Sequence, residues 1–330
     1  MEKSAWQSEW AHSLSTAEDL RDAGLVTADE AERLRPVLAR YRFRLPRYYA
    51  ALIDPSDPAC PIRRQAIPTL DELDVSSAWY ADPLGDLRHQ PAARVTHRYR
   101  GRALLHVTPN CSMYCRYCFR KSLLNELSGE LFVGAFDEAL AYFRRTSIEE
   151  VILSGGDPFL VTDRTVEQLA KALDGIPHVR RLRVHTRVPV TFPARIDRRL
   201  VDALGRFSRK KVVVTHFNHP REVTPEALAS VQMLRAGDVT VLNQSVLLAG
   251  VNDDAYVLAD LNERLFDGGV VPYYLHHPDR AAGTASFDVA IERGLAVHRE
   301  LVRRLPGYLV PRYVLDRGDG DAKTPVAELP

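Results

Sequence analysis

The chain has 330 residues, 45% of them hydrophobic, and its 44 basic and 43 acidic residues give a net charge of +1. This size and composition suffice for a large core, and the balanced charge argues against a nucleic-acid or anionic membrane surface. No run approaches the roughly 18 apolar residues of a membrane-spanning helix, and the first residues lack the apolar stretch of a secretory signal. We therefore expect a cytoplasmic protein.

The first section of the chain, to about residue 52, predicts short helices. Residues 15–18 and 27–30 match the capping-box pattern of a helix start. Pro36 falls inside the second helical pattern, where we expect it to kink or restart the helix. Residues 54–68 contain four prolines, which predict an extended, wrapping segment without regular structure. Cys60 lies in that segment and is expected to be a free or packed thiol.

From residue 96 the pattern changes to strands that alternate with helices, which predicts a parallel sheet with right-handed crossovers. No dinucleotide or P-loop fingerprint is present. We predict an α/β fold, a partial (β/α)6 TIM-like barrel (96–280) with an N-terminal helical and wrapping extension (1–95) and a C-terminal helix and segment (281–330). The expected strands are 103–107, 150–153, 181–185, 211–216, 239–247 and 270–275, and the expected helices are 134–145, 164–174, 197–206, 223–236, 255–266 and 286–304.

Three of the four cysteines, Cys111, Cys115 and Cys118, fall within eight residues directly after the first expected strand of this barrel. Cationic neighbours such as Arg116 indicate a polar, cationic loop and not a core strand, and a cationic environment lowers the pKa of a thiol. Three thiolates on one loop suit a 4Fe-4S cluster that leaves one iron open. Zinc bound by three cysteines and an outside histidine, and buried structural thiols, are the alternatives.

Polar residues follow every expected strand, and the carboxyl ends of barrel strands are where ligands bind. Gly155 and Gly156 stand at one such end, where the missing side chains would let the backbone approach a ligand closely. Any one group could be an ordinary turn or cap, but all of them together predict a site. The groups occupy residues 153–157, 185–187, 215–218, 243–245 and 273–279.

The spacing C-x-x-x-C-x-x-C after a strand resembles the signature of radical S-adenosylmethionine enzymes. Segments from about residue 45 to 326, including CSMYCRYC, SGGD, THFNHP, LNQSVLLAGVND and the final Lys-Thr-Pro, narrow this to the lysine 2,3-aminomutases and the related short enzymes that make β-lysine for elongation factor P. The resemblance implies an isomerase with a radical SAM barrel. It also implies three cofactors: a 4Fe-4S cluster, S-adenosylmethionine and pyridoxal 5'-phosphate.

The resemblance also assigns roles to residues. Lys323 matches the lysine that binds pyridoxal phosphate covalently, Arg120 the residue that pairs with the substrate carboxylate, and Asp279 and Asp316 the acids that hold the substrate's distal ammonium. Arg98, Tyr99 and Arg102 match the segment that holds the cofactor phosphate. The surroundings of S-adenosylmethionine match Ser154, Gly155, Gly156, Asp157, His216 and Gln244.

Two acids facing one site favour a cationic substrate over glutamate. We expect a 2,3-aminomutase acting on L-lysine or a close cationic amino acid, with an external electron donor of the flavodoxin or ferredoxin type and no nucleic-acid or membrane partner. The alternatives are a mutase for arginine, ornithine or glutamate, a decarboxylase with the same cofactors, and a non-catalytic cluster- or zinc-binding scaffold. A homo-oligomer is also considered. The sequence departs from the family pattern at 277–278 and in the charged run 316–322, and it lacks the cysteine-bearing tail that binds zinc in the long enzymes.

Overall fold

The computed structural model describes residues 5–74, 78–318 and 322–329. Strands in these residues form one sheet of nine, ordered along the sheet as they are in the chain. The seven strands from β2 to β8 are parallel, whereas β1 and β9 pair antiparallel at the two edges. The strands are β1 (Val95–Tyr99), β2 (Arg102–Thr108), β3 (Glu150–Gly155), β4 (Arg181–His185), β5 (Lys210–Thr215), β6 (Val239–Val246), β7 (Val271–His276), β8 (Arg312–Leu315) and β9 (Thr324–Pro325).

This sheet confirms the predicted α/β partial barrel. All six predicted strands are present, and β8 adds a seventh parallel strand that the sequence analysis missed. The edge strands β1 and β9 were missed as well, because segments of two to five residues carry too little periodicity to be recognised. Since β1 and β9 stand at opposite ends of the strand order, the sheet is open.

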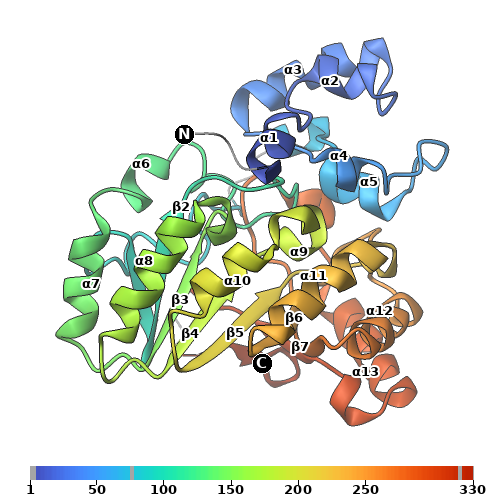
Figure 1. Ribbon diagram of the computed structural model, residues 1–330. Coiled ribbons are helices and arrows are strands. Elements are labelled where there is room, and N and C mark those ends of the chain that lie inside the picture. Colours follow the sequence, from blue (N-terminus) through green and yellow to red (C-terminus); the bar gives the residue numbers. More distant parts are fainter. Residues whose placement is uncertain (1–4, 75–77, 319–321, 330) are drawn as a thin grey trace.

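Helices pack along the outside of the sheet, as Figure 1 shows for α7, α8, α10 and α11. Several start where predicted because a side chain caps the first turn: Thr162, Asp197, Thr224 and Asp254 each accept a backbone N–H. The six crossover and C-terminal helices are α7 (Phe136–Arg144), α8 (Asp163–Asp174), α10 (Arg198–Leu204), α11 (Pro225–Ala236), α12 (Ala255–Asp267) and α13 (Ile291–Arg304).

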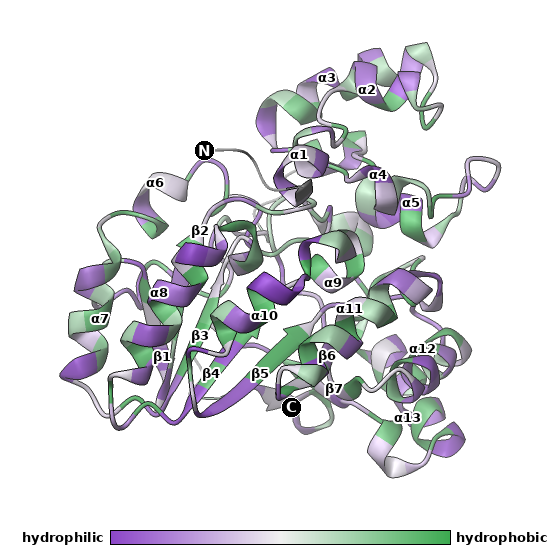
Figure 2. Ribbon diagram, viewed as in Figure 1, coloured by the Kyte–Doolittle hydropathy of each residue, from purple (hydrophilic) through white to green (hydrophobic). Residues whose placement is uncertain are grey.

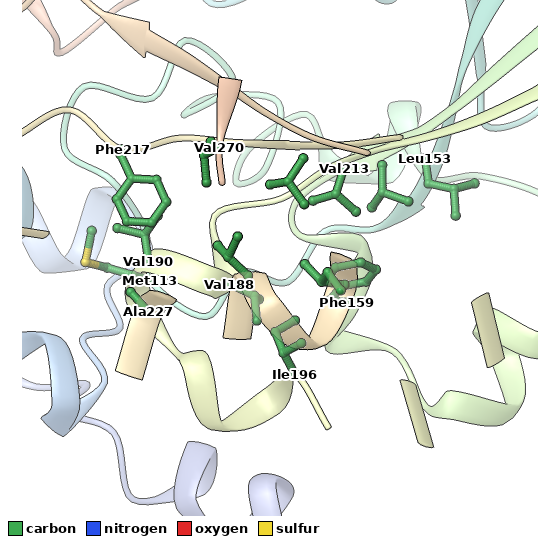
Figure 3. Packing of buried hydrophobic residues seen from close by; sticks show 14 of the residues in the cluster. Met113, Leu153, Phe159, Val188, Val190, Ile196, Val213, Phe217, Ala227 and Val270 are labelled. Atoms are coloured by element: carbon green, nitrogen blue, oxygen red, sulfur yellow. The ribbon is translucent and has the colours of Figure 1, made fainter. Parts of the chain in front are cut away.

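The core lies between the sheet and these helices. All six residues of β3 are buried, as expected of a parallel strand covered on both faces. Figure 2 shows β5 changing from hydrophilic to hydrophobic along its length, in agreement with the order Lys210, Lys211, Val212 in the sequence. In Figure 3, Phe159, Val188 and other apolar side chains pack into this core. Such packing fixes the strand ends that carry the polar groups.

The N-terminal segment is helical, as predicted, and gathers at one end of the molecule (Figure 1). Its elements are α1 (Ala5–Ala11), α2 (Ala17–Asp22), α3 (Ala28–Arg40), α4 (Arg47–Ala50), α5 (Pro61–Ala66) and the 3-10 helix η1 (Leu70–Leu73). Both capping boxes exist, although the first uses Thr16 and Asp19, one position later than predicted.

One expectation for this segment is narrowed and another is wrong. Helix α3 continues past Pro36 to Arg40, so the proline does not restart it, and a kink at Pro36 stays a prediction. Residues 54–68 are not wholly irregular, because α5 begins at Pro61, and proline is tolerated in the first turn, where its missing N–H has no partner in any case. Cys60 is a fully buried free thiol, which fits its expected packing role. Across the described part of the chain, no helix has both the length and the apolar character needed to cross a membrane.

Candidate active site

A cavity of about 340 Å³ lies at the carboxyl ends of the parallel strands, within the usual size range of small-molecule sites. Every site residue predicted from the sequence lines it. Because ligands bind at the carboxyl ends of barrel strands, the sequence could predict that these residues share one cavity, but not which of them contact one another. These residues are Arg98, Tyr99, Arg102, Cys111, Cys115, Cys118, Arg120, Ser154, Gly155, Gly156, Asp157, His216, Gln244, Asp279, Asp316 and Lys323.

The cysteine loop follows β2 and is held from the N-terminal segment. The backbone N–H of Arg116 donates to the carbonyl of Gln65 at 3.0 Å. The Arg116 guanidinium, which is 1% exposed, forms an ion pair with Glu72, and Lys121 Nζ lies 2.8 Å from the same carboxylate. The segment is a cationic loop, as predicted, but its cations are buried, and Glu72, more than 40 residues earlier in the chain, balances Arg116 and Lys121.

The pKa values of two thiols on this loop also differ from the expectation that nearby cations would lower them. Burial raises the pKa of the Cys118 thiol to about 11 and that of Cys111 well above its usual value, and repulsion between the neighbouring thiols adds to both shifts. Arg120 and Lys121 oppose the shift at Cys118, and Arg42 opposes it at Cys111, but burial outweighs them. The Cys111 and Cys118 thiols are consequently held protonated, and binding of a metal would release their protons.

The three cysteines line one cavity but do not converge on a single point. No group of three His, Cys, Asp or Glu side chains in residues 5–74, 78–318 and 322–329 is arranged around one metal ion. A cubane cluster binds each cysteine at a different iron, so its ligands surround a volume and not a point. Three separated sulfur donors on the wall of one cavity fit such a cluster.

The glycines after β3 make room for the protein's own backbone. A Cβ at Gly156 would lie 2.4 Å from the carbonyl oxygen of Asn110, and Gly155 has a φ of +110°. The backbone N–H of Gly156 donates to Thr108, and that of Asp157 donates to Asn110, each at 2.7 Å. The glycines thus let the end of β3 pack against the entry to the cysteine loop, a role that the sequence analysis did not foresee.

Asp157 organises the next strand end. Its carboxylate accepts hydrogen bonds from Thr186 Oγ1 at 2.7 Å and from the backbone N–H of Arg187 at 2.8 Å, and it caps the turn at Phe159. Burial raises the pKa of Asp157, although these donors oppose the shift. Its observed contacts are therefore with the protein's own turn after β4.

Asp316 connects the two edges of the open sheet. Its carboxylate accepts from Tyr99 Oη at 2.7 Å and from Lys323 Nζ at 2.5 Å, and it pairs with Arg98 at the end of β1. Burial opposes its ionisation, but Lys323 and Arg98 outweigh that effect and lower the pKa of Asp316 to about 2. The structure thus joins residues that the sequence assigned separately to the cofactor phosphate, the substrate ammonium and the cofactor lysine.

Asp279 is the second acid of this cavity and has the opposite pKa shift. Burial, followed by repulsion from Asp316, raises its pKa to about 7, against 3.8 for an ordinary aspartic acid. Two close carboxylates with diverging pKa values attract a proton or another cation. The cavity beside these two carboxyls is therefore suited to a positively charged group.

Arg120 lies beside the cysteine loop and already has partners. Its Nε donates to Asp86 at 2.7 Å and its Nη1 donates to Ser154 Oγ at 3.2 Å. Burial opposes the ionisation of Asp86, but Arg120 keeps the pKa of that carboxyl below its usual value. Asp86 was missed by the sequence analysis because it lies in a loop without any motif.

Histidines from three strand ends line the cavity in neutral form. Burial lowers the pKa of His216 to about 3, and burial likewise lowers the pKa values of His185 and His276 well below their usual range. His216 Nε2 lies 2.9 Å from Gln244 Nε2, so a neutral His216 can accept this hydrogen bond. His185 Nε2 is buried without a hydrogen-bond partner in the described residues, which leaves it available to a ligand.

Comparison with known proteins now decides the family. A family model described as a 4Fe-4S single cluster domain matches residues 100–180. L-lysine 2,3-aminomutase from Clostridium subterminale is 38% identical over 97% of this chain and 77% of its own. The chain belongs to the lysine 2,3-aminomutase family.

Other family members differ in length from the clostridial enzyme. L-lysine 2,3-aminomutase from Escherichia coli K12 is 36% identical over 92% of this chain and 89% of its own. A solved structure of a spore photoproduct lyase with bound AdoMet covers 62% of each chain at 14% identity and a TM-score of 0.35. Family membership confirms the prediction of a radical SAM isomerase with a 4Fe-4S cluster.

Proposed function

We propose that this protein moves the amino group of L-lysine, or of a close cationic amino acid, from the α to the β carbon, using S-adenosylmethionine and pyridoxal phosphate. The observation that carries the proposal is that Asp279 and Asp316 line the same cavity as Arg120 and that Asp316 acts electrostatically on Asp279. An amino acid with a distal cation would meet the two acids with one end and the guanidinium with its carboxylate.

Residues of the cysteine loop and the strand ends fit the cluster and S-adenosylmethionine. Cys111, Cys115 and Cys118 supply three thiolates, and the family's open iron accounts for the missing fourth ligand. Residues 154–157, His216 and Gln244 would surround S-adenosylmethionine, which supplies the radical that activates the substrate carbon. His185 Nε2, buried and unpartnered, adds a donor or acceptor in the same region.

Residues near the two edge strands, β1 and β9, fit pyridoxal phosphate. The buried Arg98 Nε has no hydrogen-bond partner in the described residues, and the Arg98 and Arg102 guanidinium carbons lie 4.8 and 4.5 Å from the centre of the Tyr99 ring. Two such guanidinium groups suit a phosphate dianion. Lys323 would hold the cofactor covalently, and the cofactor, once bound, supplies the electron-accepting system through which the amino group migrates.

The chain's own residues would then select and orient the substrate. Lys323 now neutralises Asp316 at 2.5 Å. A Lys323 that held the cofactor covalently would no longer be a free ammonium beside Asp316, and a distal substrate ammonium could take its place there. Asp279 strengthens the preference for a cation. Glutamate would instead meet carboxylate repulsion beside these acids.

A product assay tests this proposal. Protein reconstituted anaerobically with iron and sulfide to about four iron atoms per chain is supplied with S-adenosylmethionine, pyridoxal phosphate and a reductant, with flavodoxin or ferredoxin the expected natural donor. Lysine, arginine, ornithine and glutamate are offered separately and the products are identified by mass spectrometry. We expect β-lysine. Full cluster loading with no β-lysine rejects the lysine assignment, and release of CO2 would identify a decarboxylase.

A further inference from the structure

One more buried cation, besides Arg116, Arg120 and Lys121, contacts the cysteine loop, and the proposed substrate contacts give it no role. Arg187 follows β4 by two residues, and its side chain is only 8% exposed. Burying a guanidinium costs several kcal/mol unless every donor is satisfied. The hydrogen-bond partners of Arg187 therefore indicate which groups its buried charge stabilises.

All three guanidinium nitrogens of Arg187 have partners. Nη1 donates to Cys115 Sγ at 2.9 Å, and Nε donates to the carbonyl of His216 at 3.1 Å. Nη2 donates to Gln65 Oε1 at 2.7 Å and to Glu222 Oε1 at 2.6 Å. Arg187 thus extends from the end of β4 to Cys115, a predicted cluster ligand. Gln65 of the N-terminal segment also binds its guanidinium.

Glu222 fixes this cation in place. Its carboxylate is fully buried, and Tyr49 donates to its Oε1 at 2.5 Å. Oε2 accepts the backbone N–H groups of Asn218 at 2.6 Å and His219 at 3.0 Å. Because Glu222 has a complete set of donors, it cannot follow Arg187 if the arginine moves, and the guanidinium is held at Cys115.

We propose that Arg187 raises the reduction potential of the 4Fe-4S cluster through its hydrogen bond and charge at Cys115, with Glu222 setting the size of the effect. Addition of an electron makes the cluster and its thiolates more negative, so a fixed cation and an N–H donor at a ligand sulfur stabilise the reduced form. Arg187 acts through Cys115 and is a positioning residue. The inference rests on the cluster and does not depend on the substrate.

The test is a redox titration of the reconstituted protein, in which each cluster takes one electron from the titrant and the reduced form is measured by electron paramagnetic resonance. In Arg187→Met, we expect the ratio of reduced to oxidised cluster at the wild-type midpoint to fall about tenfold, which is about 59 mV for a one-electron couple. The matched control is Arg195→Met, another buried arginine, whose partners are Asp163 and two backbone carbonyls.

Two nearly isosteric substitutions distinguish an effect of charge on the midpoint potential from an effect of altered packing. Glu222→Gln removes the balancing carboxylate and should raise the midpoint, whereas Gln65→Glu adds a carboxylate at Nη2 and should lower it. A loosened site would shift both variants in the same direction, which would overturn the proposal. An unchanged midpoint in Arg187→Met at full iron content would overturn it as well. So would failure of that variant to retain a cluster that Arg195→Met retains, because the role would then be structural.

Discussion

Asp279→Asn should make the apoprotein more stable at alkaline pH while it weakens lysine binding. In the folded protein burial raises the pKa of Asp279 to about 7, against 3.8 for an ordinary aspartic acid. Between these values the folded state binds more protons than the unfolded state, so this carboxyl lowers the free energy of unfolding as pH rises from about 4 to 7. Above pH 7 its whole penalty is present.

The size of the penalty follows from the pKa difference. About three pKa units at 1.36 kcal/mol each give an upper limit of about 4 kcal/mol, and relaxation of the site around the ionised carboxylate reduces this to roughly 2 kcal/mol. Asparagine carries no charge, so the variant should gain about 2 kcal/mol at pH 8 and almost nothing near pH 4.

Urea unfolding of the apoproteins at several pH values measures this difference. Asp267→Asn, at the exposed end of α12, is the control and should show no pH-dependent gain. A variant at position 279 that is less stable than the wild type at pH 8, or whose stability difference does not change with pH, would refute the reasoning. The same substitution should raise the KM for lysine at least tenfold, since it removes half of the cation site.

Other predictions address the remaining parts of the site. Cys118→Ser should lose most of the iron after reconstitution, whereas Cys60→Ser should keep it; equal iron content would remove Cys118 from the ligand set. Lys323→Ala should lose the visible absorption of lysine-bound pyridoxal phosphate while iron content stays unchanged, and a retained absorption would assign the cofactor elsewhere. Glu72→Gln leaves Arg116 and Lys121 buried without a counter-charge, so thermal unfolding should show a loss of about 3–5 kcal/mol; a loss below 1 kcal/mol would contradict the buried ion cluster. Arg120→Lys should raise the KM for lysine more than it lowers kcat, and the reverse pattern would argue against binding of the substrate carboxylate.

The sequence predicted the strands and helices of the barrel well because their apolar periodicity extends over five or more residues. It also predicted that the polar strand ends would lie together, and they do line one cavity, since parallel strands bring their carboxyl ends to one edge whatever the details of packing. The strands that the sequence analysis missed are short. β8 and β9 carry only a few residues each, and they extend the sheet through pairing with strands far away in the sequence.

Pairings between distant residues could not be predicted. Nothing near Arg116 indicates that Glu72 neutralises it, and the loop around Asp86 gives no sign that this carboxylate meets Arg120. Gly156 was recognised as necessary for close approach, but the approaching group is Asn110 of the preceding strand end. Residues 319–321 of the charged run before Lys323 lie outside the described residues, and the domain boundaries and the oligomeric state stay predictions.

The most direct test of the proposed function follows the migrating nitrogen itself. Lysine labelled with 15N only at the α-amino group is converted anaerobically by the reconstituted protein, and the product is examined by NMR. A 2,3-aminomutase will place the 15N on the β carbon of β-lysine and release none of it. Label that remains on the α carbon, or that appears as ammonium, would contradict the proposed amino-group migration.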